Sequence, residues 1–475
     1  MGKPISFLNV PGQRGTGILD SRCVNVLFEI QVNPVTEEQK VYVVKRPGLA
    51  NNTQPPGGAA AGRGMYLWTK AAGSQLYSVF ANKVYSGTTD LGVTLAGSTG
   101  RVWWTEIPVS SGAHQLVLSD GADNYNITTA DAITQIDTTD DAQYPASNLG
   151  PVVFLDGYLF QALSNGQIWQ SDLNSLVSWT AGNFLSVDTH GGFLEAIHIQ
   201  KNQILAFTKT RIEFFFNNGN PSGSVLLRID QNTLGIGLAA KETLAFHGET
   251  CIFVGVKAND GGGTRAIFQI SSLSKVNEIS NPVINRLLNA EGSSISTASA
   301  WMEVVAGQLV YVINLDSAER TLVYSVDTRL WCEWADTSGD VKFPGIAATS
   351  TAGATVVQDV ANGRIYTFPA TTFQDSGTDF PVRITTNRSN HGSQERKFEQ
   401  SLSVIGDTTT GSLTVSTSDD DFTTFNTARN IDMSQPVKRL YRLGSFYERA
   451  HRFTYTNNAA LRLQAFVPEL TNGKH

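Results

Sequence analysis

Short apolar runs separated by glycine-rich turns recur along most of the chain, and the clearest case lies within residues 233–288. There, Ile252–Val254 and Ala266–Ile270 are two apolar runs, and Gly261–Gly263 lies between them. Runs of this length that are rich in β-branched and aromatic residues and are interrupted by glycine predict a β-hairpin with a flexible turn. We therefore interpret this stretch as one unit of a repeated β architecture.

A short helix is predicted directly after that hairpin. Ser280 and Asn281 carry side-chain oxygens that can accept hydrogen bonds from the free N–H groups of a first helical turn, and Pro282 fits that turn. Apolar residues then follow at helical spacing, which completes the signal for a helix. These residues are Val283, Ile284, Leu287 and Leu288.

The hairpin pattern occurs seven times when the central stretch is included. Between equivalent apolar positions of successive units, the steps are 39, 43, 46, 47, 58 and 46 residues. Repeats of roughly 40 to 50 residues are typical of four-stranded β-propeller blades, whereas the coils of a β-solenoid, the alternative, are usually shorter and more regular. The sequence therefore predicts an all-β protein with a propeller of about six or seven blades. The six other hairpins are Leu76–Tyr85, Gln115–Ile127, Tyr158–Trp169, Ile204–Phe216, Leu309–Val326 and Val356–Phe368.

Both ends of the chain differ from the repeats. Two strand-like runs, Val24–Gln31 and Val41–Val44, precede residues 51–64, which are rich in Pro, Gly and Ala as a linker would be. After Phe368, the polar segment Thr371–Thr378 predicts a loop. The longer alternating runs that follow suit a β-sandwich of about 100 residues, which the N-terminal strands can join. The expected parts are, in order, N-terminal strands of a platform domain at 1–50, an inserted β-propeller at 51–370 and the rest of the β-sandwich-like platform domain at 371–475.

Composition agrees with several packed bodies of short strands. The chain has 475 residues, of which 41% are hydrophobic, 16% are charged and 43 are glycines, and a length above roughly 250 to 300 residues predicts more than one hydrophobic core. No apolar run reaches the roughly 18 to 20 residues that span a membrane, and the N-terminus lacks a signal-peptide core. We expect synthesis in a cytosol and no stable membrane insertion. Cys23, Cys251 and Cys332 lack paired metal spacing and are interpreted as buried thiols.

Charge is distributed unevenly along the chain. The net charge is −7, which argues against tight binding to phosphate backbones. Residues 102–200 contain no Lys or Arg, whereas residues 438–462 are strongly basic. Such asymmetry predicts interaction surfaces, and solvated faces of a soluble protein are the alternative. The acidic residues of the first stretch are Glu106, Asp120, Asp123, Asp131, Asp137, Asp140, Asp141, Asp156, Asp172, Asp188 and Glu195. The basic residues of the second are Lys438, Arg439, Arg442, Arg449, Arg452 and Arg462.

Three short motifs suggest chemistry, and each has a plainer interpretation. Gly235–Ala240 matches G-x-G-x-x-A, but a dinucleotide site needs a helix next, and here a strand is predicted. Ser418–Phe425 resembles a sialidase Asp-box, in which an aspartate clasps a turn, although Phe422 and Phe425 replace Gly and Trp. Asn259–Gly263 offers one carboxylate, too few for calcium.

We predict no cofactor, no metal and no catalytic activity, because no nucleophile, base and orienting group are found together. The alternative is a propeller that binds carbohydrate or degrades polysaccharide. Such an enzyme would place two carboxylates across a pocket.

The order of several strand-like segments and one short helix resembles that of a known family. These segments are Arg211–Phe216, Leu234–Gly237, Cys251–Val254, Ala266–Ile270, Ile279–Ser280, Ile284–Leu288, Arg439–Gly444, Arg452–Tyr455 and Leu461–Leu463. In this arrangement the chain resembles the tail nozzle proteins of short-tailed bacteriophages (podoviruses), which include the packaged-DNA stabilisation proteins. The resemblance rests on hydrophobic patterns and not on catalytic signatures.

The resemblance implies a structural virion protein of the phage tail. It implies a homohexamer around a channel that retains double-stranded genomic DNA and later conducts it out, without sequence-specific binding. It also implies contacts with a head-to-tail adaptor protein and with tail fibre or tail needle and tip proteins.

Two sets of site residues follow from this interpretation. A channel through which DNA slides should offer few positive charges, because each phosphate contact adds affinity and friction. The candidates to line the channel are Asp120, Asp123, Asp137, Asp140 and Asp141; aspartates used only for turn chemistry are the alternative. The candidates for contacts with neighbouring subunits or the adaptor are Lys438, Arg439, Arg442, Arg449 and Arg452.

Overall fold

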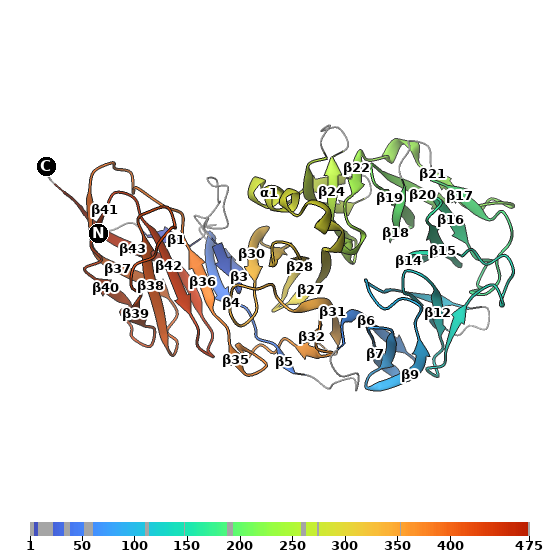
Figure 1. Cartoon of the computed structure of the whole chain (residues 1–475), viewed down its shortest axis with the longest axis horizontal. Coiled ribbons are helices and arrows are strands. Elements are labelled where there is room, and N and C mark those ends of the chain that lie inside the picture. Colours follow the sequence, from blue (N-terminus) through green and yellow to red (C-terminus); the bar gives the residue numbers. More distant parts are fainter. Residues whose placement is uncertain are drawn as a thin grey trace.

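The molecule is elongated and has two bodies (Figure 1). One body is a ring of sheets, and the other lies at the opposite end of the long axis and carries both termini (Figure 1). Within the described residues, the chain forms strands, one α-helix and three short 3-10 helices. The computed structural model describes residues 4–7, 22–32, 39–51, 60–109, 114–146, 148–187, 193–257, 263–272, 275–351 and 353–473.

The ring consists of seven blades in the described part of the chain. Six are separate sheets, and the sixth blade in chain order continues into a larger sheet outside the ring. Neighbouring blades contact each other, mostly through their inner strands, and the inner strand of the seventh blade contacts that of the first (Figure 1). The ring is therefore closed.

Each blade is antiparallel, and its strands follow one another in the chain from the inside to the outside, except that the outer strand of blade 7 comes from the N-terminal part of the chain. Blades 1 to 3 are β6 (Gly62–Lys70), β7 (Gly73–Phe80), β8 (Lys83–Ser86) and β9 (Thr89–Thr94); β10 (Trp103–Pro108), β11 (His114–Ser119), β12 (Asn124–Ile127) and β13 (Ile133–Ile136); and β14 (Asn148–Leu155), β15 (Tyr158–Leu163), β16 (Gln167–Gln170) and β17 (Phe184–Ser186). Blades 4 and 5 are β18 (Leu194–Gln200), β19 (Gln203–Thr208), β20 (Ile212–Asn217) and β21 (Leu226–Arg228); and β22 (Ile236–Leu238) with β23 (Ala245–His247), β24 (Thr250–Lys257), β25 (Arg265–Ser272) and β26 (Lys275–Glu278). Blades 6 and 7 are β27 (Ser299–Val305), β28 (Gln308–Leu315), β29 (Arg320–Ser325) and β30 (Leu330–Trp334); and β31 (Gly345–Thr351), β32 (Ala354–Asp359), β33 (Ile365–Thr367) and β5 (Ala50–Asn51). The 3-10 helices are η1 (Asp230–Asn232), η2 (Lys241–Thr243) and η3 (Gly292–Thr297).

The seven predicted hairpins are the second and third strands of the seven blades, so this prediction is confirmed. These strands read as continuous apolar runs because both of their faces are buried between neighbouring blades. In β11, Leu116 and Leu118 pack in a cluster with Trp68 of blade 1. Val117, which points the other way, packs with Val152 of blade 3.

The predicted hairpin and helix of the central stretch are also confirmed. β24 and β25 pair in register from Cys251 opposite Ile270 to Val256 opposite Arg265, and residues 258–262 of the predicted turn lie outside the described residues. The helix, α1 (Pro282–Ala290), begins after Asn281, whose side chain accepts the N–H groups of the second and third helical residues.

The N-terminal part of the chain closes the last blade. β5 pairs with β33, with Thr367 opposite Ala50, and so supplies the outer strand of a blade whose other strands come more than 290 residues later. β5, from the N-terminal part of the chain, therefore completes the last blade and closes the ring (Figure 1).

The second body is a sandwich of two sheets that both termini build, and we call it the platform. Phe7 and Phe453 lie edge to face at 5.0 Å in its core, with Phe466 beside them. The first sheet contains β1 (Ile5–Ser6), β3 (Val26–Val32), β4 (Gln39–Lys45), β43 (Arg462–Asn472), β37 (Lys397–Gly406), β40 (Arg439–Tyr441) and β41 (Ser445–Phe446). The second contains β2 (Arg22–Val24), β36 (Val382–Thr385), β42 (Ala450–Tyr455), β38 (Ser412–Ser418) and β39 (Arg429–Asp432).

One continuous sheet joins the platform to the propeller. β2 pairs with β30 of blade 6, where Val24 lies opposite Glu333, and on its other side with β36 of the platform. The result is a sheet of nine strands that spans both bodies. A hydrogen-bonded sheet resists bending at this point far more than a single connecting peptide would. The predicted fold class, a β-propeller with a sandwich-like platform built from both termini, is confirmed.

Two local expectations need correction. β6 begins at Gly62, inside the stretch interpreted as a linker, because Arg63 is buried there and bonds to surrounding carbonyl groups. The polar segment after Phe368, expected to be a loop, forms the short pair β34 (Gln374–Asp375) and β35 (Thr378–Asp379). In the residues that the structure describes, no helix is long and apolar enough to cross a membrane.

Candidate functional site

The inner strands of the seven blades surround a tunnel with a cavity of about 390 Å³. This volume lies near the lower end of the roughly 300 to 1,000 Å³ that small-molecule sites occupy. The residues that line it are 61–66, 98–104, 151–153, 197–198, 242, 245–247, 299–303, 346–349 and 360. The tunnel therefore has the size of a site for a small ligand.

Arg101 crosses the tunnel from one side of the ring to the other. It lies two residues before the inner strand of blade 2, yet its Nη1 donates to the carbonyl of Leu244 in blade 5 at 2.8 Å and to that of Ala300 in blade 6 at 3.2 Å. The guanidinium also lies over the Trp103 ring, 4.4 Å from its centroid. Burial lowers the pKa of Arg101 to about 10, and Arg101 remains a cation at neutral pH.

An imidazole and a phenyl ring form a second part of the wall. His198 of blade 4 stacks on Phe246 of blade 5, with ring centroids 4.0 Å apart. Burial and the nearby Arg101 lower the pKa of His198 to about 3. His198 is therefore neutral at physiological pH.

The two carboxylates of the tunnel wall both accept backbone N–H groups. Glu242 accepts the N–H of Arg101 at 3.1 Å, and Glu303 accepts the N–H of Val304 at 2.9 Å. Glu303 also lies 3.8 Å from Nδ1 of His247. Sequence order does not group these residues, because they come from four segments of the ring that only the register of the inner strands brings together.

The five aspartates predicted to line a channel lie on blade 2 and not in the tunnel wall. Asp120 and Asp123 belong to the turn between the second and third strands of the blade, and residues 137–141 follow its outer strand. In an antiparallel four-stranded blade these two connections lie at the same end. The fold therefore brings the five aspartates to one face of the ring.

Asp120 is buried and serves the turn. Its carboxylate accepts the N–H groups of Gly97, Ala122 and Asp123 at 2.7–2.9 Å, and its side chain does not reach the surface. Asp120 is therefore removed from the candidates for a channel wall, because a buried carboxylate that is fully hydrogen-bonded cannot face DNA.

The other four aspartates reach solvent to different degrees. Asp137 accepts both the hydroxyl and the backbone N–H of Thr139, which lowers the pKa of Asp137. Asp141 accepts the N–H groups of Trp179 and Gln143, which lowers the pKa of Asp141. Three of the four, Asp123, Asp137 and Asp141, are half-buried, and Asp140 is exposed. These positions therefore combine hydrogen bonds within turns with negative charge at the surface.

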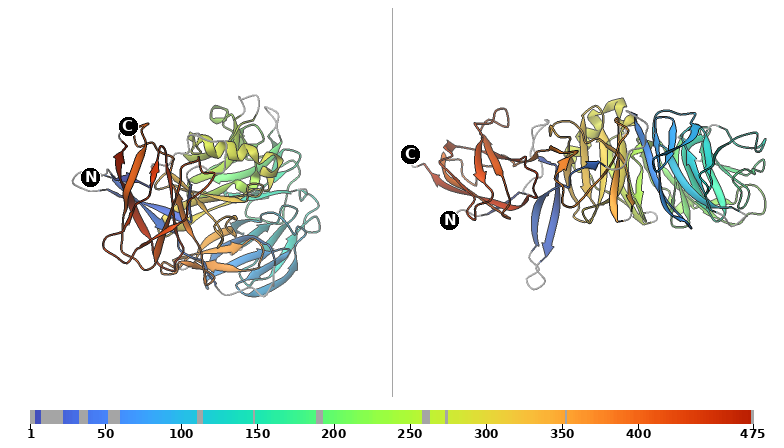
Figure 2. Two further views of the ribbon diagram at one scale, coloured as in Figure 1. Left: turned by 60° about the vertical axis from the view of Figure 1, so that its left-hand side comes forward. Right: turned by 90° about the horizontal axis from the view of Figure 1, so that it is seen from below.

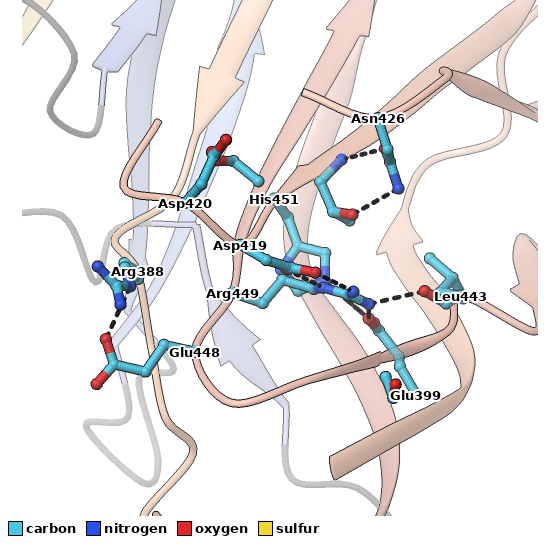
Figure 3. Close-up of polar contacts among 12 residues, drawn as sticks. Arg388, Glu399, Asp419, Asp420, Asn426, Leu443, Glu448, Arg449 and His451 are labelled. Carbon is cyan, nitrogen blue, oxygen red and sulfur yellow. Dashed lines mark hydrogen bonds and ion pairs between the residues drawn. The ribbon is translucent and has the colours of Figure 1, made fainter. Parts of the chain in front are cut away.

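The basic segment divides into buried and exposed residues. Arg449 is buried and pairs with Asp419 at 2.7 Å and with Glu399 at 2.9 Å (Figure 3), and Lys438 is also buried. These two residues are corrected from interface candidates to internal ones, because a buried side chain cannot meet a partner. Arg439 and Arg442 are exposed, and Arg452 is half-buried with its guanidinium 3.4 Å from the Phe425 ring centroid.

Arg449 belongs to a buried polar network in the platform (Figure 3). Glu399 accepts from Arg449 and also lies 3.0 Å from Nε2 of His451. Burial alone would raise the pKa of Glu399, but the interactions with His451 and Arg449 outweigh it and the pKa is lowered. Such a network satisfies buried charges and defines how the two platform sheets pack.

The two remaining motifs have structural roles. The Asp-box-like segment clasps a turn, because Asp420 accepts the N–H and hydroxyl of Thr424 and the hydroxyl of Ser418. In the G-x-G-x-x-A segment, a side chain at Gly237 would lie 1.9 Å from the carbonyl oxygen of Lys209, so this glycine permits two backbones to pass closely. A strand and a short 3-10 helix follow it and not the helix that a dinucleotide site needs.

Metal binding has no support from the described residues, among which no cluster of three or more His, Cys, Asp or Glu is placed to hold an ion. Four of the five positions weighed for calcium, Asn259 to Gly262, lie outside the described residues. Cys23, Cys251 and Cys332 are free and buried, as predicted.

Comparison with known proteins identifies the family. The sequence model of a family described as "Bacteriophage P22 Gp10, beta-propeller" matches residues 13–373, which is more than half of the chain. The chain belongs to this phage-stabilisation family. As a member of the P22 Gp10 family, it is a phage tail β-propeller protein, and the predicted resemblance to phage tail nozzle and stabilisation proteins is confirmed.

The match to the P22 Gp10 family covers all seven blades and ends at residue 373, before most platform strands. A search of curated protein sequences finds no match. Among solved structures, streptogramin B lyase is 11% identical, with 69% of this chain and 97% of that chain covered and a TM-score of 0.40. The virginiamycin B lyase from Staphylococcus aureus is 12% identical, with 69% and 98% covered and a TM-score of 0.40. The N-terminal domain of Nup159 is 9% identical, with 73% and 98% covered and a TM-score of 0.39.

Proposed function

We propose that this protein is the subunit of a homohexameric tail nozzle of a short-tailed phage, which retains packaged DNA and later provides the channel for genome ejection. The observation that carries the proposal is the family match, because it covers the complete ring of blades. The protein is synthesised in the host cytoplasm and resides in the tail of the virion, without stable insertion into a membrane.

The size of the propeller tunnel supports an assembly of several chains. A cavity of about 390 Å³ suits a small molecule, and the side chain of Arg101 crosses it. A DNA duplex cannot pass such a tunnel. Any DNA channel is therefore formed between subunits, as a closed ring of copies would provide.

The platform supplies the end of the subunit that joins the adaptor protein. It lies at one end of the long axis (Figures 1 and 2), and the nine-stranded sheet transmits its orientation to the propeller. Exposed on it are Val437, Tyr441 and Tyr447, at 57–68% of their surface, together with Arg439 and Arg442. Tyrosine and arginine are enriched at protein interfaces. Tail fibre or tail needle and tip proteins are the proposed partners of the propeller end.

We assign the solvent-facing aspartates of blade 2 to the channel wall. Asp123, Asp137, Asp140 and Asp141 lie on one face of a blade that carries no Lys or Arg. A wall of this charge repels phosphates and keeps a hydrated duplex centred, because it offers no Lys or Arg that could bind phosphates and release the counterions of the DNA. Binding to DNA is accordingly independent of sequence.

Light scattering and electron microscopy of the purified chain, alone and with the adaptor protein of the same phage, test the assembly. Six-fold rings are expected, either alone or on addition of the adaptor. Phage that carry the triple change Asp123→Asn, Asp137→Asn and Asp140→Asn should assemble normally and eject DNA more slowly. A monomer that ignores the adaptor and is absent from purified virions would overturn the proposal.

A polysaccharide-degrading propeller is the competing function, and we propose that the protein is not an enzyme. The tunnel carboxylates Glu242 and Glu303 both accept backbone N–H groups, and this fixes the position of each side chain. Incubation of the purified chain with host capsule should release no reducing sugar. Release that disappears in Glu242→Gln and Glu303→Gln variants would establish the enzyme instead.

A further inference from the structure

The propeller tunnel has a set of side chains that the nozzle function does not use. It is the cavity of about 390 Å³ bounded by all seven inner strands, and its size corresponds to roughly a dozen waters at about 30 Å³ each. Arg101, Glu242, Glu303, His198 and His247 line it together with aromatic rings. Charged side chains at the centre of the ring call for an explanation. Apolar side chains could fill the tunnel instead, and the ring would then not have the free-energy cost of removing charged groups from water.

The charges of the tunnel wall balance one another. Arg63 and Arg101 contribute two positive charges, Glu242 and Glu303 contribute two negative charges, and His198 is neutral. A ligand with a net charge would be attracted by the two side chains of opposite charge and repelled by the two of like charge. The wall therefore favours a ligand that is neutral overall.

The polar groups of the wall can both donate and accept hydrogen bonds to such a ligand. Arg101 is a pure donor, Glu303 is a pure acceptor, and the neutral imidazole of His198 has one donor and one acceptor nitrogen. Hydroxyl groups are the ligand atoms that match both kinds, because each hydroxyl donates once and accepts twice. A small molecule with several hydroxyl groups would form hydrogen bonds with both the donors and the acceptors of this wall.

Aromatic rings provide flat apolar surfaces beside these polar groups. Phe246 is 41% exposed although it stacks on His198, and Trp103, Trp104 and Trp301 also line the tunnel. A flat aromatic surface packs well against the C–H face of a six-membered ring. A hydroxylated ring with an apolar face thus matches both kinds of surface.

We infer that the tunnel binds a neutral saccharide, one or two sugar rings in size. Glu303 and His198 bind its hydroxyl groups, Arg101 donates to a ring or hydroxyl oxygen, and Phe246 packs on one face of the ring. The binding requires no chemistry on the sugar. The site belongs to the single chain, so it does not depend on whether the chain forms a hexamer.

Isothermal titration calorimetry of the purified full chain tests the inference. The probes are the methyl glycosides of glucose, galactose, mannose, N-acetylglucosamine and rhamnose, with glucuronate and glucosamine as charged counterparts. At least one neutral glycoside should bind, and its charged counterpart should bind at least roughly tenfold more weakly, because a buried unpaired charge is costly.

Two matched pairs of variants locate the site. Glu303→Gln should weaken binding roughly tenfold or more, as the loss of a hydrogen bond to a charged group does. Phe246→Ala should weaken it by a similar factor, because the apolar face of the sugar loses the aromatic surface on which it packs. Glu249→Gln and Phe193→Ala change an exposed carboxylate and an exposed ring outside the tunnel and should leave binding unchanged. Circular dichroism confirms that each variant is folded; Phe246 is exposed enough for its loss to be tolerated.

Two results would overturn the inference. One is the absence of heat with every neutral glycoside. The other is binding that Glu303→Gln and Phe246→Ala leave unchanged, which places the sugar elsewhere. Light scattering on the same samples tests the nozzle function separately. Rings without sugar binding would refute only the saccharide site, and sugar binding without rings would refute only the nozzle function.

Discussion

Arg46 and Asp375 form a buried, bidentate ion pair at the junction of the propeller and the platform, although 329 residues separate them in the sequence. Nη2 of Arg46 lies 2.6 Å from Oδ2 of Asp375, and the Arg46 side chain is completely buried. The guanidinium also donates to Asn25 and to the carbonyls of Pro47 and Ala335. All of its N–H groups therefore have acceptors.

The pair connects three separate parts of the chain. Asn25 lies between two N-terminal strands, Ala335 follows the outer strand of blade 6, and Asp375 belongs to the short pair that leads into the platform. Phe380 covers the guanidinium, with its ring centroid 3.9 Å away. This contact and the nine-stranded sheet together fix the angle between the two bodies.

Removal of one partner should destabilise the whole chain. Asp375→Asn leaves the Arg46 charge buried without a carboxylate, and breaking a buried pair in this way costs about 3–5 kcal/mol. Urea unfolding measures the change. The matched control is Asp340→Asn, which breaks the exposed pair with Arg383 and should cost at most about 1 kcal/mol. Equal effects of the two changes would contradict the importance of the junction.

The platform network gives a prediction about acid. The pKa of Glu399 is lowered from 4.5 because His451 and Arg449 together outweigh the effect of burial. The folded state therefore binds this proton less readily than the unfolded state. The stability that Glu399 contributes is fully present above pH 4.5 and is lost as the pH falls below it.

Glu399→Gln should accordingly lower the stability at neutral pH and flatten its decline below pH 4.5. Urea unfolding of the wild type and the variant at a series of pH values measures the difference between the two curves. Glu395→Gln changes an exposed carboxylate on the same segment and should leave the pH dependence of the free energy of unfolding unchanged. Parallel curves for the wild type and Glu399→Gln would show that the network does not titrate with folding.

The parts of the fold that the sequence predicts well are those in which burial leaves a strong pattern. The middle strands of the blades are apolar on both faces, as with Leu116 and Val117, and all seven hairpins are recognisable for this reason. The helix is recognisable because Asn281 and Pro282 mark its start. Outer strands such as β17 and β21 are short and partly exposed, and they carry no comparable signal.

The candidate site is harder to predict because its residues are distant in the sequence. Arg101, His198 and Glu303 come from different blades, and each is unremarkable among its sequence neighbours. Asp375 lies in a polar stretch that suggests a loop, although its partner Arg46 buries it. The charge pattern alone does not distinguish buried charges from exposed ones, since Asp120 and Arg449 are both buried and engaged.

The turn that Asp120 holds should matter for stability, unlike its exposed neighbours. Asp120→Ala leaves three N–H groups without their acceptor, and buried donors without partners cost about 1–3 kcal/mol. Asp140→Ala, at an exposed position of the same blade, should change the unfolding midpoint little. Urea unfolding followed by tryptophan fluorescence compares the two. A large loss of stability with Asp140→Ala and none with Asp120→Ala would contradict the prediction that the buried Asp120 stabilises the turn and the exposed Asp140 does not.

The closure of the ring should be its weakest seam, because β5 contributes two residues to blade 7 in the part of the chain that the structure describes. Ala50 lies directly opposite Thr367, and opposite residues of antiparallel strands are close enough for a disulfide to be attempted. Ala50→Cys combined with Thr367→Cys should form this bond under oxidising conditions and raise stability by about 2–4 kcal/mol. The native thiols are all buried, so thiol titration of the folded protein reports the new pair alone. Thermal unfolding with and without reductant measures the gain, and Ala50→Cys by itself is the control. A bond that forms without raising the unfolding temperature would show that the ring opens first at another blade.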